Sequence, residues 1–114
     1  MNYFTRFEEL GRIRDEANLS GDNKLGNKAY KEMEKIYERA VGDSDKEKFY
    51  LGIIEMSSSP SALITCCAHM MRMNIKSGIA RKKLEEIAKN STYHPIFQFN
   101  AKMFLTEWDK GNIK

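Results

Sequence analysis

Apolar side chains recur every three or four positions along most of this 114-residue chain, which is the spacing of amphipathic helices. The stretch over about 60–73 is apolar around nearly its whole circumference, which is typical of a central, buried helix. No segment shows the alternation of a convincing strand. The pattern therefore predicts an all-α protein of about six helices. The first runs over about 3–19 and the fourth over about 60–73; the second has its apolar stripe over 29–41 and the third over 49–56; the fifth runs to about Asn90, and the sixth begins near Ile96.

Turn and capping residues separate these helices. Ser44 stands three residues before Glu47, which is the spacing of a capping box and predicts the start of the third helix. Ser59 is placed to cap the fourth helix, with Pro60 at its first helical position. Gly111 is expected to end the last helix as a C-cap. The links between the helices are therefore short.

Short links favour antiparallel neighbours, so we expect three helix hairpins, formed by the first and second, third and fourth, and fifth and sixth helices. Stacked side by side, these hairpins would form a short HEAT-like α-solenoid. A globular helical bundle is the alternative. The length of the chain predicts a single helical domain over residues 1–114.

The charge of the chain is uneven. Residues 1–55 hold 10 basic and 12 acidic side chains, a net charge of −2, whereas residues 56–114 hold 9 basic and 4 acidic ones, a net charge of +5. A polarised surface of this kind can orient a partner. The overall charge of +3 is too weak to establish nucleic-acid binding.

The sequence also bears on the location of the protein. No apolar run approaches the roughly 18 residues that a membrane span needs. Charged side chains interrupt the N-terminal residues, which does not fit a signal peptide. We therefore expect a cytoplasmic protein that does not enter a membrane.

Two adjacent cysteines and two histidines are the candidates for metal or thiol chemistry. Zinc sites usually need a second ligand pair at a suitable spacing, and Cys66, Cys67 and His69 have only His94 beyond them. The cysteines lie in an apolar helix, where a thiolate is disfavoured. Paired carboxylates such as Glu85-Glu86 have Lys or Arg nearby, which indicates a solvated face. We therefore expect no catalytic residue, no metal and no other cofactor.

The best candidate for a basic patch is the run Arg81-Lys82-Lys83, with Arg72 and Lys76 nearby. Three cations near a helix N-terminus are unfavourable for the helix dipole, so contact with phosphates is one interpretation. The interleaved aromatic residues of many nucleic-acid sites are missing here. A solvated first turn of the fifth helix is therefore the favoured interpretation.

Four motifs follow one another along residues 21–114: Gly21-Asp22-Asn23-Lys24 with Asn27-Lys28-Ala29-Tyr30, Cys66-Cys67-Ala68-His69-Met70-Met71, Leu84-Glu85-Glu86-Ile87-Ala88, and Phe99-Asn100-Ala101 through Leu105-Thr106-Glu107-Trp108-Asp109-Lys110-Gly111. Their order and spacing resemble a bacterial family of HEAT-like, all-helical domains of unknown function. Members of that family often lie beside genes of polymorphic or contact-dependent toxins. The chain departs from the family at Leu63 and Thr65, where an arginine and an aromatic residue are usual.

The resemblance implies a HEAT-like fold and a binding protein that is not an enzyme. More sharply, it implies an immunity protein of a contact-dependent inhibition system, a monomer that binds one cognate toxin domain and covers its active site. A nuclease is one candidate for the toxin. The alternatives are a general protein-interaction scaffold with no toxin partner, and a weak nucleic-acid binder that uses residues 81–83.

The candidates for partner binding come from both halves of the chain. Carboxylates of the acidic half would oppose the basic cleft of a nuclease and speed association. Aromatic residues of the loop around Pro95 would be good interface anchors if exposed. Chosen by charge, exposure and helix position, the candidates are Glu34, Glu38, Asp43, Asp45, Glu55, Arg72, Tyr93 and His94.

Overall fold

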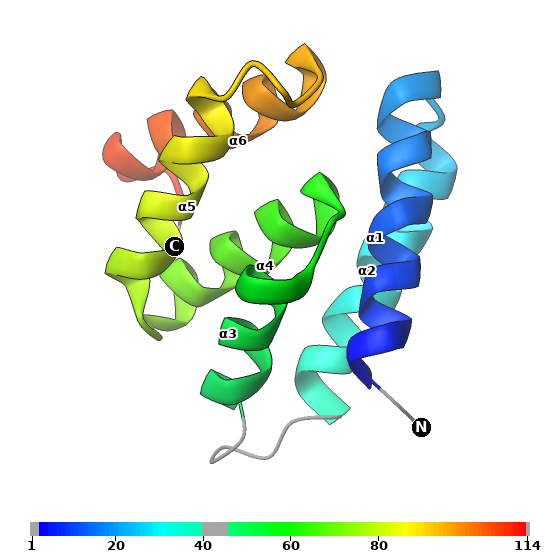
Figure 1. Ribbon diagram of the computed structural model, residues 1–114, viewed down its shortest axis with the longest axis horizontal. Helices are drawn as coiled ribbons and strands as arrows, with labels where there is room; N and C mark the ends of the chain where they lie inside the picture. The colour runs from blue at the N-terminus through cyan, green and yellow to red at the C-terminus, as the bar shows by residue number, and fades with distance from the viewer. Residues whose placement is uncertain (1–2, 40–45, 114) are drawn as a thin grey trace. The chain divides into compact units, whose positions relative to one another are not determined.

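The computed structural model describes residues 3–39 and 46–113 (Figure 1). Every regular element in this part of the chain is an α-helix, so the all-α prediction is confirmed. None of the described helices is both long enough and apolar enough to cross a membrane. The helices are α1 (Tyr3–Ser20), α2 (Asn23–Arg39), α3 (Lys46–Met56), α4 (Pro60–Met73), α5 (Ser77–Lys89) and α6 (Pro95–Asp109).

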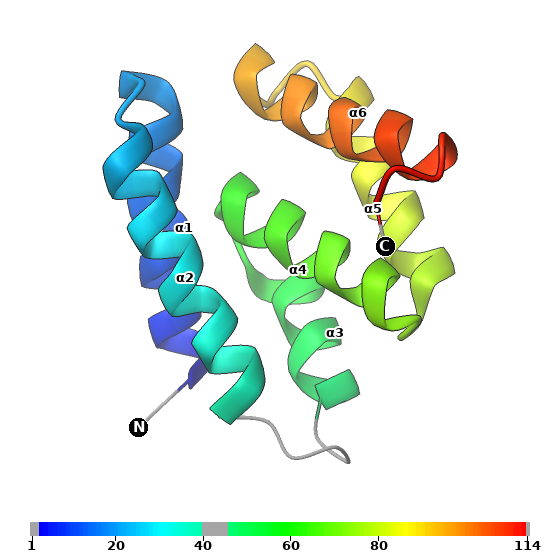
Figure 2. The ribbon, with the colours of Figure 1, turned by 180° about the vertical axis from the view of Figure 1, so that it is seen from behind.

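The chain divides into two compact units, Met1–Leu63 and Ile64–Lys114, with the boundary inside α4. In the first unit α1 and α2 lie side by side, and in the second unit α5 and α6 do the same (Figure 2). These are two of the three expected hairpins. The third, α3 with α4, involves a helix that belongs to both units, and the solenoid arrangement and the single domain stay predictions. Residues 56–63 carry no charge, so the net charge is −2 in the first unit and +5 in the second.

An aromatic cluster fills the centre of the first unit. Phe7 of α1 and Tyr50 of α3 are fully buried, and Tyr37 of α2 is nearly so. The Phe7 ring meets the Tyr37 ring edge-on at a centroid distance of 5.3 Å and the Phe49 ring at 5.7 Å. The rings of Tyr37 and Tyr50 lie 5.2 Å apart. Because aromatic pairs at these distances add to the energy of burial, the cluster joins α1, α2 and α3 in one core.

Ser59, the residue just before α4, and two carboxylates of α1 accept hydrogen bonds at the start of α4. The Ser59 hydroxyl accepts a hydrogen bond of 3.1 Å from the backbone N–H three residues on, which confirms the expected N-cap. Glu8 accepts one from the backbone N–H of Ser58 at 3.1 Å, and Asp15 accepts one from that of Ser61 at 2.8 Å. These side-chain oxygens accept from backbone N–H groups that have no partner within the helix, so the contacts hold α1 against the first turn of α4.

The buried carboxyl of Asp15 predicts that the stability of the first unit depends on pH. Burial raises the pKa of its carboxyl above the ordinary 3.8, and hydrogen bonds from Ser61 and Ser59 oppose that rise. Because the folded-state pKa exceeds that of the unfolded chain, the contribution of Asp15 to stability is greatest at low pH. It is lost as the pH rises through the raised pKa.

The variant Asp15→Asn tests this dependence, because its amide oxygen can still accept the Ser61 N–H but cannot ionise. Its free energy of unfolding relative to wild type should increase between about pH 3.5 and about pH 7, measured by urea denaturation. Glu16→Gln, at an exposed position of α1, controls for the loss of a charge from this helix. A difference between Asp15→Asn and wild type that stays constant with pH would contradict the prediction.

The core of the second unit lies between α5, α6 and the later residues of α4. Leu84 and Ile87 of α5, Ala101 of α6 and Met70 of α4 are all fully buried. Gly111 has a φ of +76° and follows the last turn of α6, as expected of the residue that ends this helix. The hairpin of α5 and α6 therefore presents one end at the loop of residues 90–94 and the other near Gly111.

Candidate binding surface

The thiols occupy a protected position in the second unit. Cys66 and Cys67 are thiols, not joined in a disulfide, and both are fully buried in α4; the Cys66 sulfur lies 3.9 Å from the sulfur of Met70. Burial raises the pKa of the Cys67 thiol to about 12. A thiol with such a pKa stays protonated at neutral pH and is a weak nucleophile. In the part of the chain that the structure describes, no three His, Cys, Asp or Glu residues lie close enough together to hold a metal ion.

The acidic candidates of the first unit lie on two helices. Glu34 and Glu38 are one turn apart on α2, the former partly buried and the latter exposed. Glu55 is exposed near the end of α3. Asp43 and Asp45 lie outside the described residues. The structure therefore brings Glu34 and Glu38 to one face of α2 and places Glu55 on a separate helix.

Arg14 offsets part of the negative charge of α2. Its guanidinium lies over the Tyr30 ring, 4.6 Å from the centroid. Burial lowers the pKa of Arg14, whereas nearby acidic groups, among them the carboxylates of Asp15 and Glu34, act to raise it. An arginine stays protonated under ordinary conditions. Glu34 therefore already acts on a cation within its own unit, and Glu38 is the more available of the two carboxylates.

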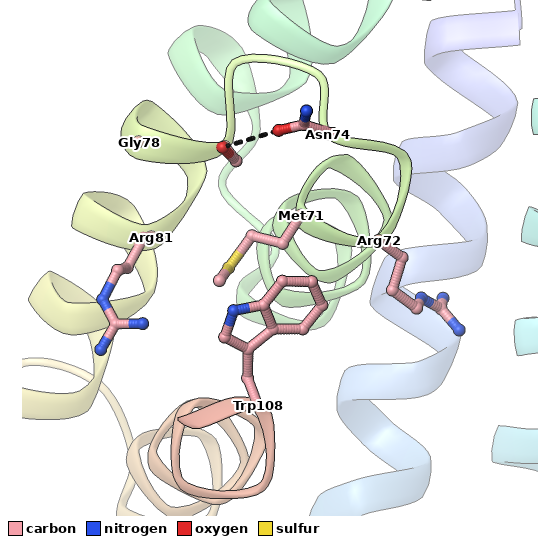
Figure 3. A pocket seen from close by; sticks show the side chains of 7 residues that line it. Met71, Arg72, Asn74, Gly78, Arg81 and Trp108 are labelled. Carbon is pink, nitrogen blue, oxygen red and sulfur yellow. Dashed lines mark hydrogen bonds between the residues drawn. The ribbon is translucent and has the colours of Figure 1, made fainter. Parts of the chain in front are cut away.

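Arg72 lines an open pocket in the second unit. The pocket lies where the end of α4, the start of α5 and the end of α6 meet, and its volume is about 380 Å³. In Figure 3 the side chains of Met71 and Trp108 lie against each other between the helices, with Arg72 and Arg81 on either side. The lining residues are Met71, Arg72, Asn74, Ser77, Gly78, Arg81 and Trp108.

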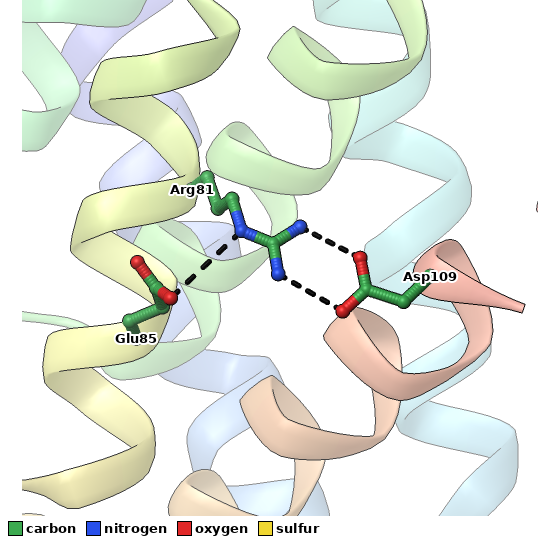
Figure 4. Close-up of polar contacts among 3 residues, drawn as sticks. All are labelled: Arg81, Glu85 and Asp109. Atoms are coloured by element: carbon green, nitrogen blue, oxygen red, sulfur yellow. Dashed lines mark hydrogen bonds and ion pairs between the residues drawn. The ribbon is translucent and has the colours of Figure 1, made fainter.

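Arg81 is partly exposed and forms a surface ion pair with Asp109 at the end of α6. Two of its guanidinium nitrogens donate to the two oxygens of Asp109 at 2.8 and 2.9 Å, and its Nε lies 3.8 Å from Glu85 (Figure 4). These hydrogen bonds raise the pKa of Arg81 and lower the pKa of Asp109. Lys83 forms an ion pair with Glu86 at 3.4 Å. Two cations of the basic run therefore have acidic partners, which offsets the unfavourable charge at the start of α5.

Tyr93 and His94 lie at the other end of the α5–α6 hairpin. Tyr93 is partly buried and His94 is exposed. The imidazole Nδ1 of His94 accepts a hydrogen bond of 3.1 Å from the backbone N–H of Ile96, so this residue caps α6. Because α5 has 13 residues, the loop and the Arg72 pocket are about 20 Å apart along the helix. The structure does not bring Arg72 together with Tyr93 and His94.

The capping role of His94 can be tested by stability. His94→Ala should lower the free energy of unfolding by about 1 kcal/mol, because it leaves the N–H of Ile96 without its acceptor. His94→Asn supplies another side-chain acceptor at the cap and should retain most of the stability. Thermal unfolding of the three proteins checks this, and equal losses in the two variants would argue against a cap.

Sequence reasoning missed an exposed surface on α6. We define the α6 face as Phe99, Lys102, Met103 and Lys110, all of which are exposed. Phe99 and Met103 are 56% and 47% exposed, whereas the opposite side of α6 is buried in the core. At 3.6 residues per turn these four side chains fall within a sector of about 100°. The available signal was that Phe99 and Met103 stand outside the inward stripe of this helix.

No protein-family model, curated protein or solved structure matches the chain. The resemblance to the HEAT-like family therefore stays a prediction, as does the function that it implies.

Proposed function

We propose that this protein is an immunity protein of the cytoplasm, which binds one cognate toxin domain and neutralises it by covering its active site. The observation that supports a binding function most is the α6 face, where two large apolar side chains one turn apart are exposed to solvent. Aromatic residues and methionine are enriched at protein interfaces, and here a residue of each kind is exposed on one face of a helix. The toxin as partner comes from the family resemblance.

The positions of the reactive side chains support binding rather than catalysis. The Cys67 thiol is held protonated by burial. Glu8 and Asp15 accept hydrogen bonds at the start of α4, and Arg81 is held by Asp109. Each of these groups therefore already has a structural role.

The ion pairs of Arg81 and Lys83 disfavour the nucleic-acid alternative, because phosphate binding would have to compete with Asp109 and Glu86. A general scaffold is the remaining alternative. It differs from an immunity protein in the number and strength of its partners, because immunity requires one tight complex.

A pull-down with the full chain as bait, from the strain that encodes it, tests the proposal. We expect one stoichiometric protein partner that is toxic when expressed alone and harmless when co-expressed with this chain. Several weak partners would favour a scaffold. Recovery of nucleic acid that is released from the bait at high salt would favour nucleic-acid binding through the basic run. Either of these results would overturn the immunity function.

A further inference from the structure

The charges on the α6 face are all positive. The two carboxylates of α6 have partners within the second unit: Asp109 is held by Arg81, and Glu107 accepts a hydrogen bond of 2.6 Å from Asn112. Among the residues that the structure describes, none pairs with Lys102 or Lys110. The surrounding unit has a net charge of +5. Asn112 is neutral, so Glu107 keeps its negative charge beside this face, whereas the charge of Asp109 is offset by Arg81. A partner that approaches the α6 face therefore meets two lysines in a unit of net positive charge.

The apolar residues of the same face have the spacing found in helices that dock into a groove of a protein partner. Phe99 and Met103 stand four residues apart, so their side chains are neighbours on the helix surface. A helix that inserts into a partner's groove uses anchors at this spacing. Aromatic residues and methionine are also enriched at the centres of protein interfaces, where they fill apolar pockets.

We infer that the α6 face is the docking surface for the toxin and that the toxin presents to it an apolar recess bordered by carboxylates. Phe99 and Met103 enter the recess, and Lys102 and Lys110 meet the acidic rim. This inference rests on the proposed function and adds to it the chemistry of the partner. It also places contact on the basic unit, rather than on the acidic residues of α2 that a basic nuclease cleft would favour.

Charge argues against two other occupants of the α6 face. A second copy in a symmetric dimer would bring the lysines of both copies to one interface, where like charges repel. Nucleic acid is bound by dense arrays of cations, and this face offers two lysines around an apolar centre. A protein with an acidic rim satisfies both the lysines and the apolar side chains.

Paired variants test the inference, with the partner purified from its complex with the wild-type chain as the probe. Binding is measured by calorimetry, and the association rate by stopped flow at two salt concentrations. Phe99→Ala with Met103→Ala removes the anchors, and Lys102→Glu with Lys110→Glu reverses the rim. The matched controls lie in the first unit: Leu19→Ala with Met56→Ala, 55% and 70% exposed in wild type, and Lys24→Glu with Lys28→Glu, both exposed on α2.

We expect the apolar double variant to lose at least about thirtyfold in affinity, because anchors at an interface centre dominate binding. The charge-reversed variant should associate about tenfold more slowly at low salt, with a smaller deficit at high salt. Both control pairs should stay within about twofold of wild type, since they lie outside the α6 face. All variants change exposed side chains, and an unaltered helical circular dichroism spectrum verifies that they fold.

Each contrary result has a distinct meaning. If the partner binds both α6 variants as tightly as wild type, the docking surface is refuted and the immunity function stands. If the wild-type chain captures no stoichiometric partner, both proposals fall. Loss of binding to a labelled 20-nucleotide oligothymidine, with protein binding intact, would reassign the face to nucleic acid. If light scattering gives the mass of a dimer for wild type and of a monomer for the apolar variant, the α6 face would instead be the interface with a second copy of the chain.

Discussion

Phe7→Ala should lower the free energy of unfolding by about 3–5 kcal/mol, because it removes the ring at the centre of the first unit. Phe7 is fully buried, and its ring contacts those of Tyr37 and Phe49 edge-on. Its truncation costs the transfer free energy of the ring, opens a cavity and removes two aromatic contacts. Because small domains are stable by only about 5–15 kcal/mol, this one change removes a large part of the total.

Urea denaturation followed by circular dichroism measures the effect of Phe7→Ala, and Phe99→Ala is its matched control. The control makes the same chemical change on α6, where the side chain is 56% exposed, and should cost less than about 0.5 kcal/mol. Similar losses in the two variants would mean that Phe7 is not at the centre of a packed core.

Much of the fold follows from local patterns, which explains why it could be predicted. The periodicity of apolar residues located the helices, because one face of each is buried. Ser59 and Gly111 marked helix ends, because capping depends on residues within one turn of the terminus. Phe7 belongs to the stripe that predicted α1, although its ring partners, which lie on other helices, could not be read from that stripe.

The ion pair that engages the basic run from α6 is a contact of long range, and for that reason the sequence did not reveal it. Arg81 and Asp109 are 28 positions apart, so their ion pair depends on how α6 packs on α5. His94 is a candidate interface anchor on condition that it is exposed, and the structure shows it exposed; its role as a cap depends on the rotamer of one side chain. The α6 face was missed because apolar residues occur on the outer side of this helix as well as on its inner side, so that apolar character alone does not separate the two.

Gly11→Ala should destabilise the protein by about 2 kcal/mol, against the usual direction for a glycine within a helix. A Cβ at this position would lie 2.6 Å from the Cβ of Ala62 and 2.8 Å from the hydroxyl oxygen of Ser59. It would also lie 3.1 Å from the backbone nitrogen of Ala62, which cannot move aside by rotating a side chain. The added methyl therefore pushes α1 off the first turn of α4 and disturbs the Ser59 cap.

Gly52→Ala is the matched control, because it makes the same change within α3, where a Cβ would meet nothing within 4 Å. It should stabilise the protein by about 0.5–1 kcal/mol through the loss of freedom in the unfolded chain. Opposite signs in urea denaturation would show that close approach, rather than helix propensity, decides the effect at Gly11. Ala62→Gly removes the nearest clashing atom, so it should cost less in the Gly11→Ala background than in wild type. Additive effects of Gly11→Ala and Ala62→Gly would instead mean that α1 and α4 do not meet at this point.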